Sequence, residues 1–349
     1  NRGIFMELSL TSLLPLAWYV ILGVAVFAYS FGDGFDLGLG AVYLKAKEDK
    51  ERRILLNSIG PVWDGNEVWL VIIVGGLFAG FPACYATLLS IFYMPIWTLV
   101  LLYIFRGCSL EFRSKSESVS WKIFWDIIFI CSGTAISFFL GTIVGNLILG
   151  LPLSPDTSYA SLSWILFFRP YAALCGAVVA SAFAIHGSCF ALMKTSDSLN
   201  ARIAQQFPYI LSSFLVFYVL FLGASLISIP KRFDAFPTYP LLILLIALTS
   251  CCCVAAKTSV SKKRYGYAFI YSTLNLLSLI LSAATLTFPN ILLSTVDPQY
   301  SYTIYNSAVE TKTLKSLLII VLIGLPFIIT YTCYIYRVFR GKTNFPSIY

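Results

Sequence analysis

Charged residues are scarce in this chain. Only 11% of its 349 residues are Asp, Glu, Lys or Arg, whereas 58% are hydrophobic. An ordinary soluble domain carries about 25% charged residues, so this composition excludes a soluble globular protein and a disordered chain. It indicates a membrane protein that crosses the bilayer several times.

Residues that hold metals or haem are also few. The chain has one histidine, His186, and its nine cysteines form no C-x-x-C pair, so no zinc or iron–sulfur site is predicted. Haem ligation by two histidines within the chain is excluded. Met193 lies on the same helix face as His186 and cannot ligate the opposite side of a haem, which leaves open only a pair with Met94.

Long apolar runs predict an all-α polytopic fold. A bilayer core needs about 20 apolar residues per helix, and by that measure we count about nine transmembrane helices. They run over residues 13–43, 62–80, 83–105, 122–149, 164–193, 207–229, 238–256, 266–289 and 314–339. The Phe81-Pro82 turn between the second and third spans predicts a tight helical hairpin.

The basic residues predict the orientation. If the N-terminus is outside, the inward loops are 44–61, 106–121, 194–206, 257–265 and 340–349. Together with the adjoining helix ends they hold 18 of the 24 Lys and Arg residues. The outward side keeps six: Arg2, Arg169, Lys231, Arg232, Lys312 and Lys315. This excess predicts an outside N-terminus and a cytoplasmic C-terminus, as an odd number of spans requires.

Two acidic residues interrupt the first span. Asp33 and Asp36 are three residues apart, so they share a face if the helix continues. Ionisable groups within a span are costly and often functional, which makes both aspartates candidates for proton transfer. The alternative is structural, because neighbouring glycines permit a helix kink that the aspartates cap.

The second span opens with another acidic pair. Asp64 and Glu67 are again three apart, and Trp63 and Asn66 stand beside them. Acids in a first turn also suit the helix dipole, so a purely structural role is the alternative. Two helices that each offer an acidic pair near the inner face could form a proton-conducting cluster.

Three further polar residues are candidates. Arg106 has the right depth to pair with Asp36 or Asp64, or it is a basic anchor at the membrane surface. Glu111 is interfacial, and His186 lies in the fifth span, where a lone buried histidine usually has a structural role.

Several motifs resemble subunit II of the cytochrome bd-type quinol oxidases. They are DGFDLG at 33–38, ERR at 51–53, NSI at 57–59, PVWDGNEVWL at 61–70, RG at 106–107, LEFR at 110–113, GN at 145–146 and HG at 186–187. They match in order through the first 150 residues, and fragments such as FP at 288–289 extend the resemblance over nearly the whole chain.

The resemblance implies a fold and a partner. The expected fold is a four-helix bundle in residues 1–160, a second in 161–290, and a peripheral ninth helix within 291–349. The expected partner is a haem-bearing subunit I in a bacterial cytoplasmic (inner) membrane. That subunit would oxidise quinol and reduce O2, so this chain would bind no haem or metal itself. A small accessory subunit and a structural quinone in this chain stay open.

The resemblance also implies roles for single residues. Asp64 and Glu111 match positions associated with a proton path toward subunit I, and Asp36 and Arg106 match positions implicated near the subunit interface. Val62 stands where some relatives have histidine, so a path through that histidine would be absent, although Glu67 could replace it.

A secondary transporter or permease is the competing interpretation. Broken helices with acids and glycines at the membrane midplane would suit it. Here the acids lie toward the inner ends of the first two spans, which favours the oxidase subunit.

Overall fold

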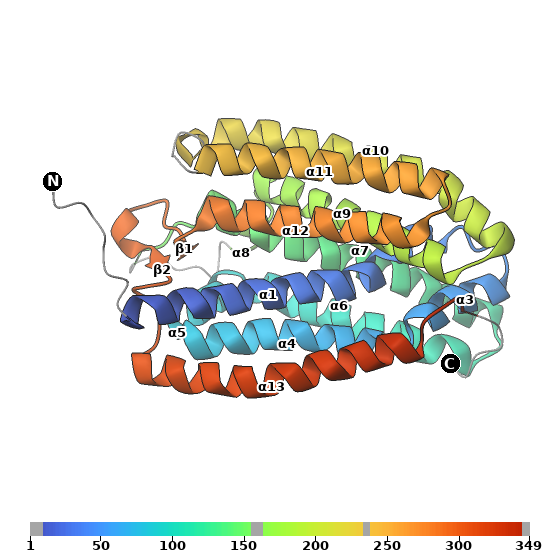
Figure 1. Cartoon of the computed structure of the whole chain (residues 1–349), viewed down its shortest axis with the longest axis horizontal. Coiled ribbons are helices and arrows are strands. Elements are labelled where there is room, and N and C mark those ends of the chain that lie inside the picture. The colour runs from blue at the N-terminus through green and yellow to red at the C-terminus, as the bar shows by residue number, and fades with distance from the viewer. Residues whose placement is uncertain (1–9, 155–162, 233–237, 344–349) are drawn as a thin grey trace.

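The computed structural model describes residues 10–154, 163–232 and 238–343, and most of them are helical. The long helices run side by side along the longest axis of the molecule (Figure 1). The α-helices are α1 (Leu10–Gly38), α2 (Gly40–Tyr43), α3 (Asp49–Ile59), α4 (Trp63–Gly80), α5 (Pro82–Ile91), α6 (Tyr93–Phe112), α7 (Val119–Leu149), α8 (Ser163–Phe167), α9 (Pro170–Lys194), α10 (Asp197–Ser228), α11 (Thr238–Ser261), α12 (Tyr265–Thr287) and α13 (Thr311–Val338).

The all-helical membrane fold is confirmed. Among the described residues, eight helices are long and apolar enough to cross a membrane, and the bent pair α3 and α4 makes a ninth. The first span, Leu13–Tyr43, continues through α2, and the last, Thr311–Val338, is α13. Both agree with the predicted ranges 13–43 and 314–339 to within a few residues.

The predicted third span and its tight hairpin were wrong. Residues 83–105 do not form one helix, because the helix is interrupted at Phe92, where α5 ends and α6 begins. Pro95 explains the break: it has no N–H to donate to the carbonyl of Ile91, so it fits only in the first turn of a new helix. The span therefore runs from Tyr93 to Lys115 and places Arg106 well inside it.

The segment 44–61, predicted as a loop, contains the polar helix α3. Glu48 and Glu51 form a reciprocal capping box at its start. The helix ends before Pro61, and α4 then leaves at an angle of 45°. Pro61 thus lies in the break between the two helices and not in the first turn of the span.

Glycine contacts bring the central helices together. A Cβ atom on Gly38 of α1 would overlap the backbone carbonyl of Phe183 in α9, and one on Gly187 of α9 would overlap the backbone of Gly38. Such contacts let two helix backbones approach closely inside a membrane. They fix α1 against α9, and α9 also packs along α7 and α10.

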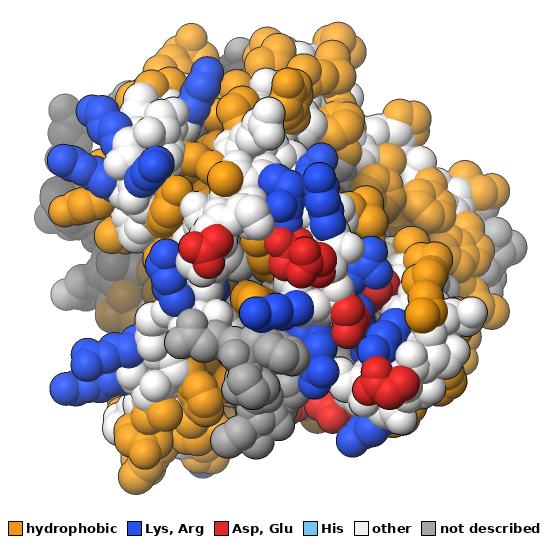
Figure 2. Space-filling model, turned by 90° about the vertical axis from the view of Figure 1, so that its right-hand side faces the viewer, with side chains coloured by type: hydrophobic (Ala, Val, Ile, Leu, Met, Phe, Trp, Pro, Cys, Tyr) orange, Lys and Arg blue, Asp and Glu red, His pale blue; other side chains and the backbone are white. Residues whose placement is uncertain are grey.

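One end of the molecule is strongly charged. We call it the charged end: it is the end at which α3 lies, where α4, α7, α10 and α12 begin (right in Figure 1). Figure 2 shows Lys, Arg, Asp and Glu side chains gathered on this face. The loops that were predicted to face inward lie at the charged end, as expected. That this end faces the cytoplasm stays a prediction.

The opposite end carries short elements. The strands β1 (Asn290–Leu292) and β2 (Tyr302–Thr303) pair antiparallel there, and α5 and α8 lie nearby (Figure 1). Arg2 and the predicted boundary at residues 160–161 fall outside the described residues, so the grouping into two bundles of those bounds stays a prediction.

The α1–α9 contact predicts the effect of one methyl group. Gly38→Ala should destabilise the folded chain by about 1–3 kcal/mol, because the two backbones must separate. Gly23→Ala in the same helix is the matched control, since a Cβ there meets nothing within 4 Å. Thermal unfolding of the purified protein should show a lower midpoint for G38A than for G23A, and equal midpoints would contradict the proposed role of the contact.

Candidate functional site

Four charged side chains from three helices meet inside the molecule. We call Asp33, Asp36, Glu67 and Arg106 the buried acid cluster; they come from α1, α4 and α6. Arg106 Nη1 lies 2.9 Å from Asp33 Oδ1 and 2.5 Å from Glu67 Oε1. The side chains of Asp33 and Arg106 are fully buried, whereas that of Glu67 is 23% exposed. The cluster therefore reaches the surface of the chain at Glu67.

The pairing of Arg106 differs from the sequence prediction. Arg106 forms ion pairs with Asp33 and Glu67, and not with Asp36 or Asp64. Asp64 and Glu67 do not play equivalent parts, because Asp64 is exposed at the charged end and makes no ion pair among the described residues. The helix break before Trp63 directs the Asp64 side chain outward and the Glu67 side chain toward α6.

Asp36 is held by an amide. Asn66 Nδ2 donates to Asp36 Oδ2 at 2.7 Å, and Tyr336 OH of α13 donates to Asn66 Oδ1 at 2.8 Å. Gly32 makes this contact possible, because a Cβ there would lie 2.8 Å from Asn66 Oδ1. The peripheral helix α13 is thereby linked to the buried acid cluster.

Two tyrosines continue the cluster on its other side. Tyr29 OH donates to Asp33 Oδ2 at 2.6 Å, and the hydroxyl groups of Tyr29 and Tyr103 are hydrogen-bonded to each other. Within the described part of the chain, Asp36 Oδ1 and Arg106 Nε and Nη2 are buried without a hydrogen-bond partner. The cluster thus keeps polar atoms free for further hydrogen bonds.

His186 is a structural link inside the chain. Its Nε2 lies 3.0 Å from the carbonyl oxygen of Phe31 and its Nδ1 lies 2.8 Å from Ser272 Oγ, while its ring stacks on Phe269. A carbonyl oxygen only accepts, so Nε2 carries a proton and donates a hydrogen bond to Phe31, while Nδ1 is hydrogen-bonded to the serine hydroxyl. Both nitrogens are used in joining α1, α9 and α12, which leaves neither for a metal or an ion pair.

Comparisons with known proteins give the family. Over residues 14–339 the chain matches the family described as Cytochrome bd terminal oxidase subunit II. It is 30% identical over 334 residues to the cytochrome bd ubiquinol oxidase subunit 2 of Bacillus subtilis, with 94% of this chain and 96% of that protein covered. This chain belongs to the cytochrome bd terminal oxidase subunit II family.

Further similarities agree. The probable cytochrome oxidase subunit 2 of Haemophilus influenzae is 28% identical, with 95% of each chain covered. The cytochrome bd-I ubiquinol oxidase subunit 2 of Escherichia coli K12 is 26% identical over 94% of this chain and 95% of that protein. The fold matches a chain in the structure of bd oxidase from Geobacillus thermodenitrificans, with a TM-score of 0.77 at 16% identity, covering 93% of this chain and 98% of that chain.

Membership in the subunit II family confirms the resemblance drawn from the motifs. The chain is a multi-pass membrane subunit of a cytochrome bd oxidase. Two residues matched to proton-path positions lie apart from the buried acid cluster: Asp64 and Glu111 are both exposed. Trp63 is half-buried and its ring lies against Gly107 of α6, so it packs beside the cluster without bonding to it.

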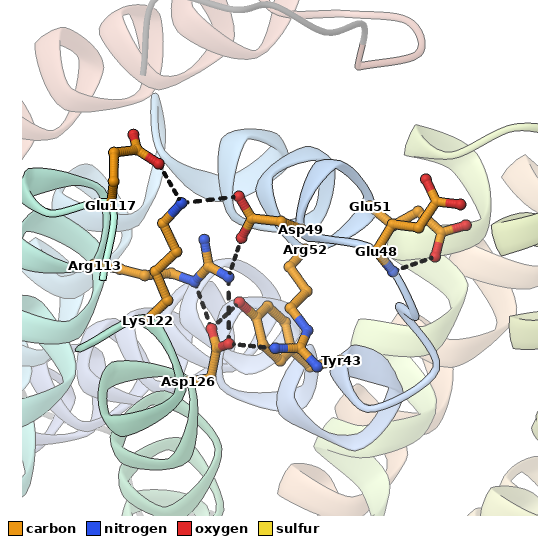
Figure 3. Close-up of polar contacts among 9 residues, drawn as sticks. All are labelled: Tyr43, Glu48, Asp49, Glu51, Arg52, Arg113, Glu117, Lys122 and Asp126. Carbon is orange, nitrogen blue, oxygen red and sulfur yellow. Dashed lines mark hydrogen bonds and ion pairs between the residues drawn. The ribbon is translucent and has the colours of Figure 1, made fainter. Parts of the chain in front are cut away.

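A second ionic cluster in this subunit II was not anticipated from the sequence. We call it the charged-end network (Figure 3), and Asp126 is its centre. Tyr43 OH and Arg113 Nε both donate to Asp126 Oδ1 at 2.5 Å, and Arg52 Nη1 donates to Oδ2 at 2.8 Å. These residues come from α2, α3, the short 3-10 helix η1 (Arg113–Lys115) and α7, so one buried carboxylate joins four elements.

The periphery of the charged-end network is exposed. Asp49 Oδ1 accepts from Arg113 Nη2 at 2.8 Å, and Lys122 Nζ bridges Asp49 and Glu117 (Figure 3). Glu51 is ion-paired with Arg202, which attaches α10 to α3. Because α3 is polar, hydropathy alone gave no sign that it folds back over these helix ends.

Neither cluster forms a metal site. Among the described residues there is no group of three or more His, Cys, Asp or Glu side chains that could hold a metal ion. The two clusters offer carboxylates, tyrosines and two buried guanidinium groups, those of Arg106 and Arg113.

The charged-end network predicts a stability effect. Asp126→Asn leaves the buried Arg113 without its main counter-charge and should cost about 3–5 kcal/mol. The thermal unfolding midpoint of the purified complex should fall accordingly.

Glu117→Gln is the matched control. A hydrogen bond from Lys122 holds the pKa of the Glu117 carboxyl below its ordinary value. A lowered pKa contributes stability above the unfolded-state pKa that is lost as the pH falls through the folded-state pKa. Glu117 is fully exposed and solvent screens this effect, so its loss should change the midpoint little. A D126N midpoint equal to that of E117Q would refute the role of Asp126.

Proposed function

We propose that this chain is the haem-free membrane subunit of a quinol:oxygen oxidoreductase of the bd type. It would support assembly of the haem-bearing subunit I and deliver protons from the cytoplasmic side. Haems bound by subunit I supply the redox chemistry, in which quinol is oxidised and O2 is reduced to water. Proton uptake from one side of the membrane makes the reaction electrogenic.

The observation that carries the proposal is the charge imbalance of the buried acid cluster. Three carboxylates face one guanidinium, so full ionisation would leave a net charge of about −2 in low-dielectric surroundings, at a high cost in free energy. A group of coupled carboxylates in this position exchanges protons as a unit. The cluster is therefore suited to holding a proton and releasing it.

The geometry offers an entry. Glu67 is the partly exposed member, and Asp64 lies one turn before it, toward the charged end of α4. Residues three apart on a helix share a face. A proton taken up near Asp64 can reach Glu67. Glu67 and Asp33 both contact Arg106 Nη1, so the guanidinium, which itself stays protonated, brings the two carboxyl groups of the path together. Tyr29 and Tyr103 extend the hydrogen-bonded path beyond Asp33.

The same face suits a protein partner. Large apolar residues are exposed along α4 and α6, the helices that carry Glu67 and Arg106; they include Val68, Val71, Phe78, Trp97, Ile104 and Phe105. A carboxylate at such a surface would be costly against lipid hydrocarbon. We infer that subunit I covers this face and receives the protons.

A large apolar cavity fits the tail of a structural quinone. It has a volume of about 650 Å³ and lies among α1, α7, α9, α10 and α12. Its lining is almost entirely aliphatic and aromatic, with hydroxyl groups such as those of Ser30 and Ser225. These residues would hold the apolar chain, and a quinone there would have a structural role without taking part in turnover.

Removal of the carboxyl charge at the entry tests the proton role. Glu67→Gln should lower quinol-driven O2 consumption by at least about tenfold, since proton transfer steps by a positioned group contribute on the order of 10²–10⁴. Asp64→Asn should lower it less, because Asp64 makes no bond within the cluster. Glu310→Gln, at the opposite end, is the control. Full turnover of E67Q with an intact haem spectrum would remove the proton-path proposal.

Removal of the cation tests the assembly role. Arg106→Met leaves buried carboxylates without their counter-charge, at a cost of about 3–5 kcal/mol, and should reduce the yield of haem-containing complex. Asp33→Asn combined with Arg106→Met removes one negative charge as well and should restore part of that yield. If the double variant assembles no better than R106M alone, the Arg106–Asp33 ion pair does not explain the reduced yield of haem-containing complex.

A further inference from the structure

Two cavities adjoin at the charged end, where α10 and α11 lie side by side. The first is a groove of about 590 Å³ between the two helices. Its walls are largely apolar and include Leu211, Leu215 and Val254. Val254 is 65% exposed, so the groove opens on the outer surface of a pair of membrane-spanning helices.

The second cavity continues the first toward the end of the bundle. It has a volume of about 490 Å³, and polar and charged residues make up more of its lining than they do in the groove. Lys257 and Ser261 line both cavities. Beyond them the polar cavity is lined by residues that include Asp197, Asn200, Lys263, Tyr265 and Lys342.

The charge around this pair of cavities is unbalanced. The sequence from residue 235 to 296 contains four cations, Lys257, Lys262, Lys263 and Arg264, and no acid. None of the four forms an ion pair among the described residues. They lie in α11 and the turn before α12. Among the residues that line the two cavities, Asp197 alone is acidic.

The depth matches the lipid headgroups. Helix α11 has 24 residues, which makes it about 36 Å long at 1.5 Å per residue, against about 30 Å for the hydrocarbon core. Lys257 lies one turn before the end of the helix and Lys262 just past it. Lysines in such positions extend along the helix to the membrane surface.

We propose that the two cavities form one binding site for an anionic glycerophospholipid. An acyl chain lies in the groove between α10 and α11. The phosphate lies at the junction, between Lys257 and Ser261, within the field of Lys262 and Lys263. The polar cavity takes the headgroup, and its hydroxyl groups donate to the Asp197 carboxylate. Basic pockets between spanning helices bind anionic lipid headgroups on this physical basis.

The match between charge and shape favours a lipid over a soluble anion. A soluble anion would need the lysines but not an apolar groove beneath them, and the groove accounts for the larger of the two volumes. The site is also separate from the α4 and α6 face, so a lipid there competes with no contact of the proposed partner subunit.

The test uses the intact oxidase complex in detergent. Dioleoylphosphatidylglycerol is titrated in, and bound lipid is counted by native mass spectrometry, with dioleoylphosphatidylcholine as the neutral reference. Lys257→Gln with Lys263→Gln should weaken phosphatidylglycerol binding by about tenfold, as expected for two lysines at an anionic headgroup. Phosphatidylcholine binding should not change.

Two controls separate the alternatives. Lys47→Gln with Lys115→Gln removes the same charge at the same end, from exposed residues outside the groove, and should change binding less than twofold. Ser212→Phe fills the groove without changing charge and should also weaken phosphatidylglycerol binding. Equal losses in both double-lysine variants, unchanged binding in S212F, or displacement of the lipid by inorganic phosphate would each overturn the proposal.

Discussion

Much of the structure depends on the burial of one guanidinium group among carboxylates. Arg106 reaches across from α6 to Asp33 of α1 and Glu67 of α4, and both it and Asp33 are fully buried. Hydrocarbon cannot solvate such groups, so the protein itself must provide their polar partners. This requirement holds α1, α4 and α6 together and brings their buried acidic residues to one place.

The two ionic clusters satisfy that requirement differently. In the charged-end network, Asp126 has two arginines and a tyrosine, so its charge is fully compensated. The buried acid cluster has more carboxylates than cations, and Asp36 Oδ1 and Arg106 Nε and Nη2 have no hydrogen-bond partner among the described residues. A carboxylate whose charge is fully paired is suited to holding helices together, whereas a carboxylate with incomplete pairing is suited to gaining and losing protons. This contrast is the physical basis for the proposal that one cluster stabilises the fold and the other transfers protons.

The sequence predicted the helical membrane fold well, because long apolar runs depend on bilayer thickness and little else. It did not predict the break at Phe92, since a hydropathy count passes over a helix break within an apolar run. Of the candidate site residues, Asp33, Asp36, Glu67 and Arg106 do converge. Asp64 and Glu111 do not, because the bend before α4 and the exposed face of α6 direct them outward. Asp126 was missed since its partners come from segments that only the folded chain brings together.

The most direct test of the account is a redox-induced infrared difference spectrum of the purified complex, which reports carboxyl groups that change protonation during turnover. If the buried acid cluster carries protons, the native complex shows a carboxyl band that is lost when Glu67 is replaced by Gln or Asp33 by Asn. A carboxyl region that is the same in the native complex and in both variants would contradict the claim that the buried acid cluster carries protons.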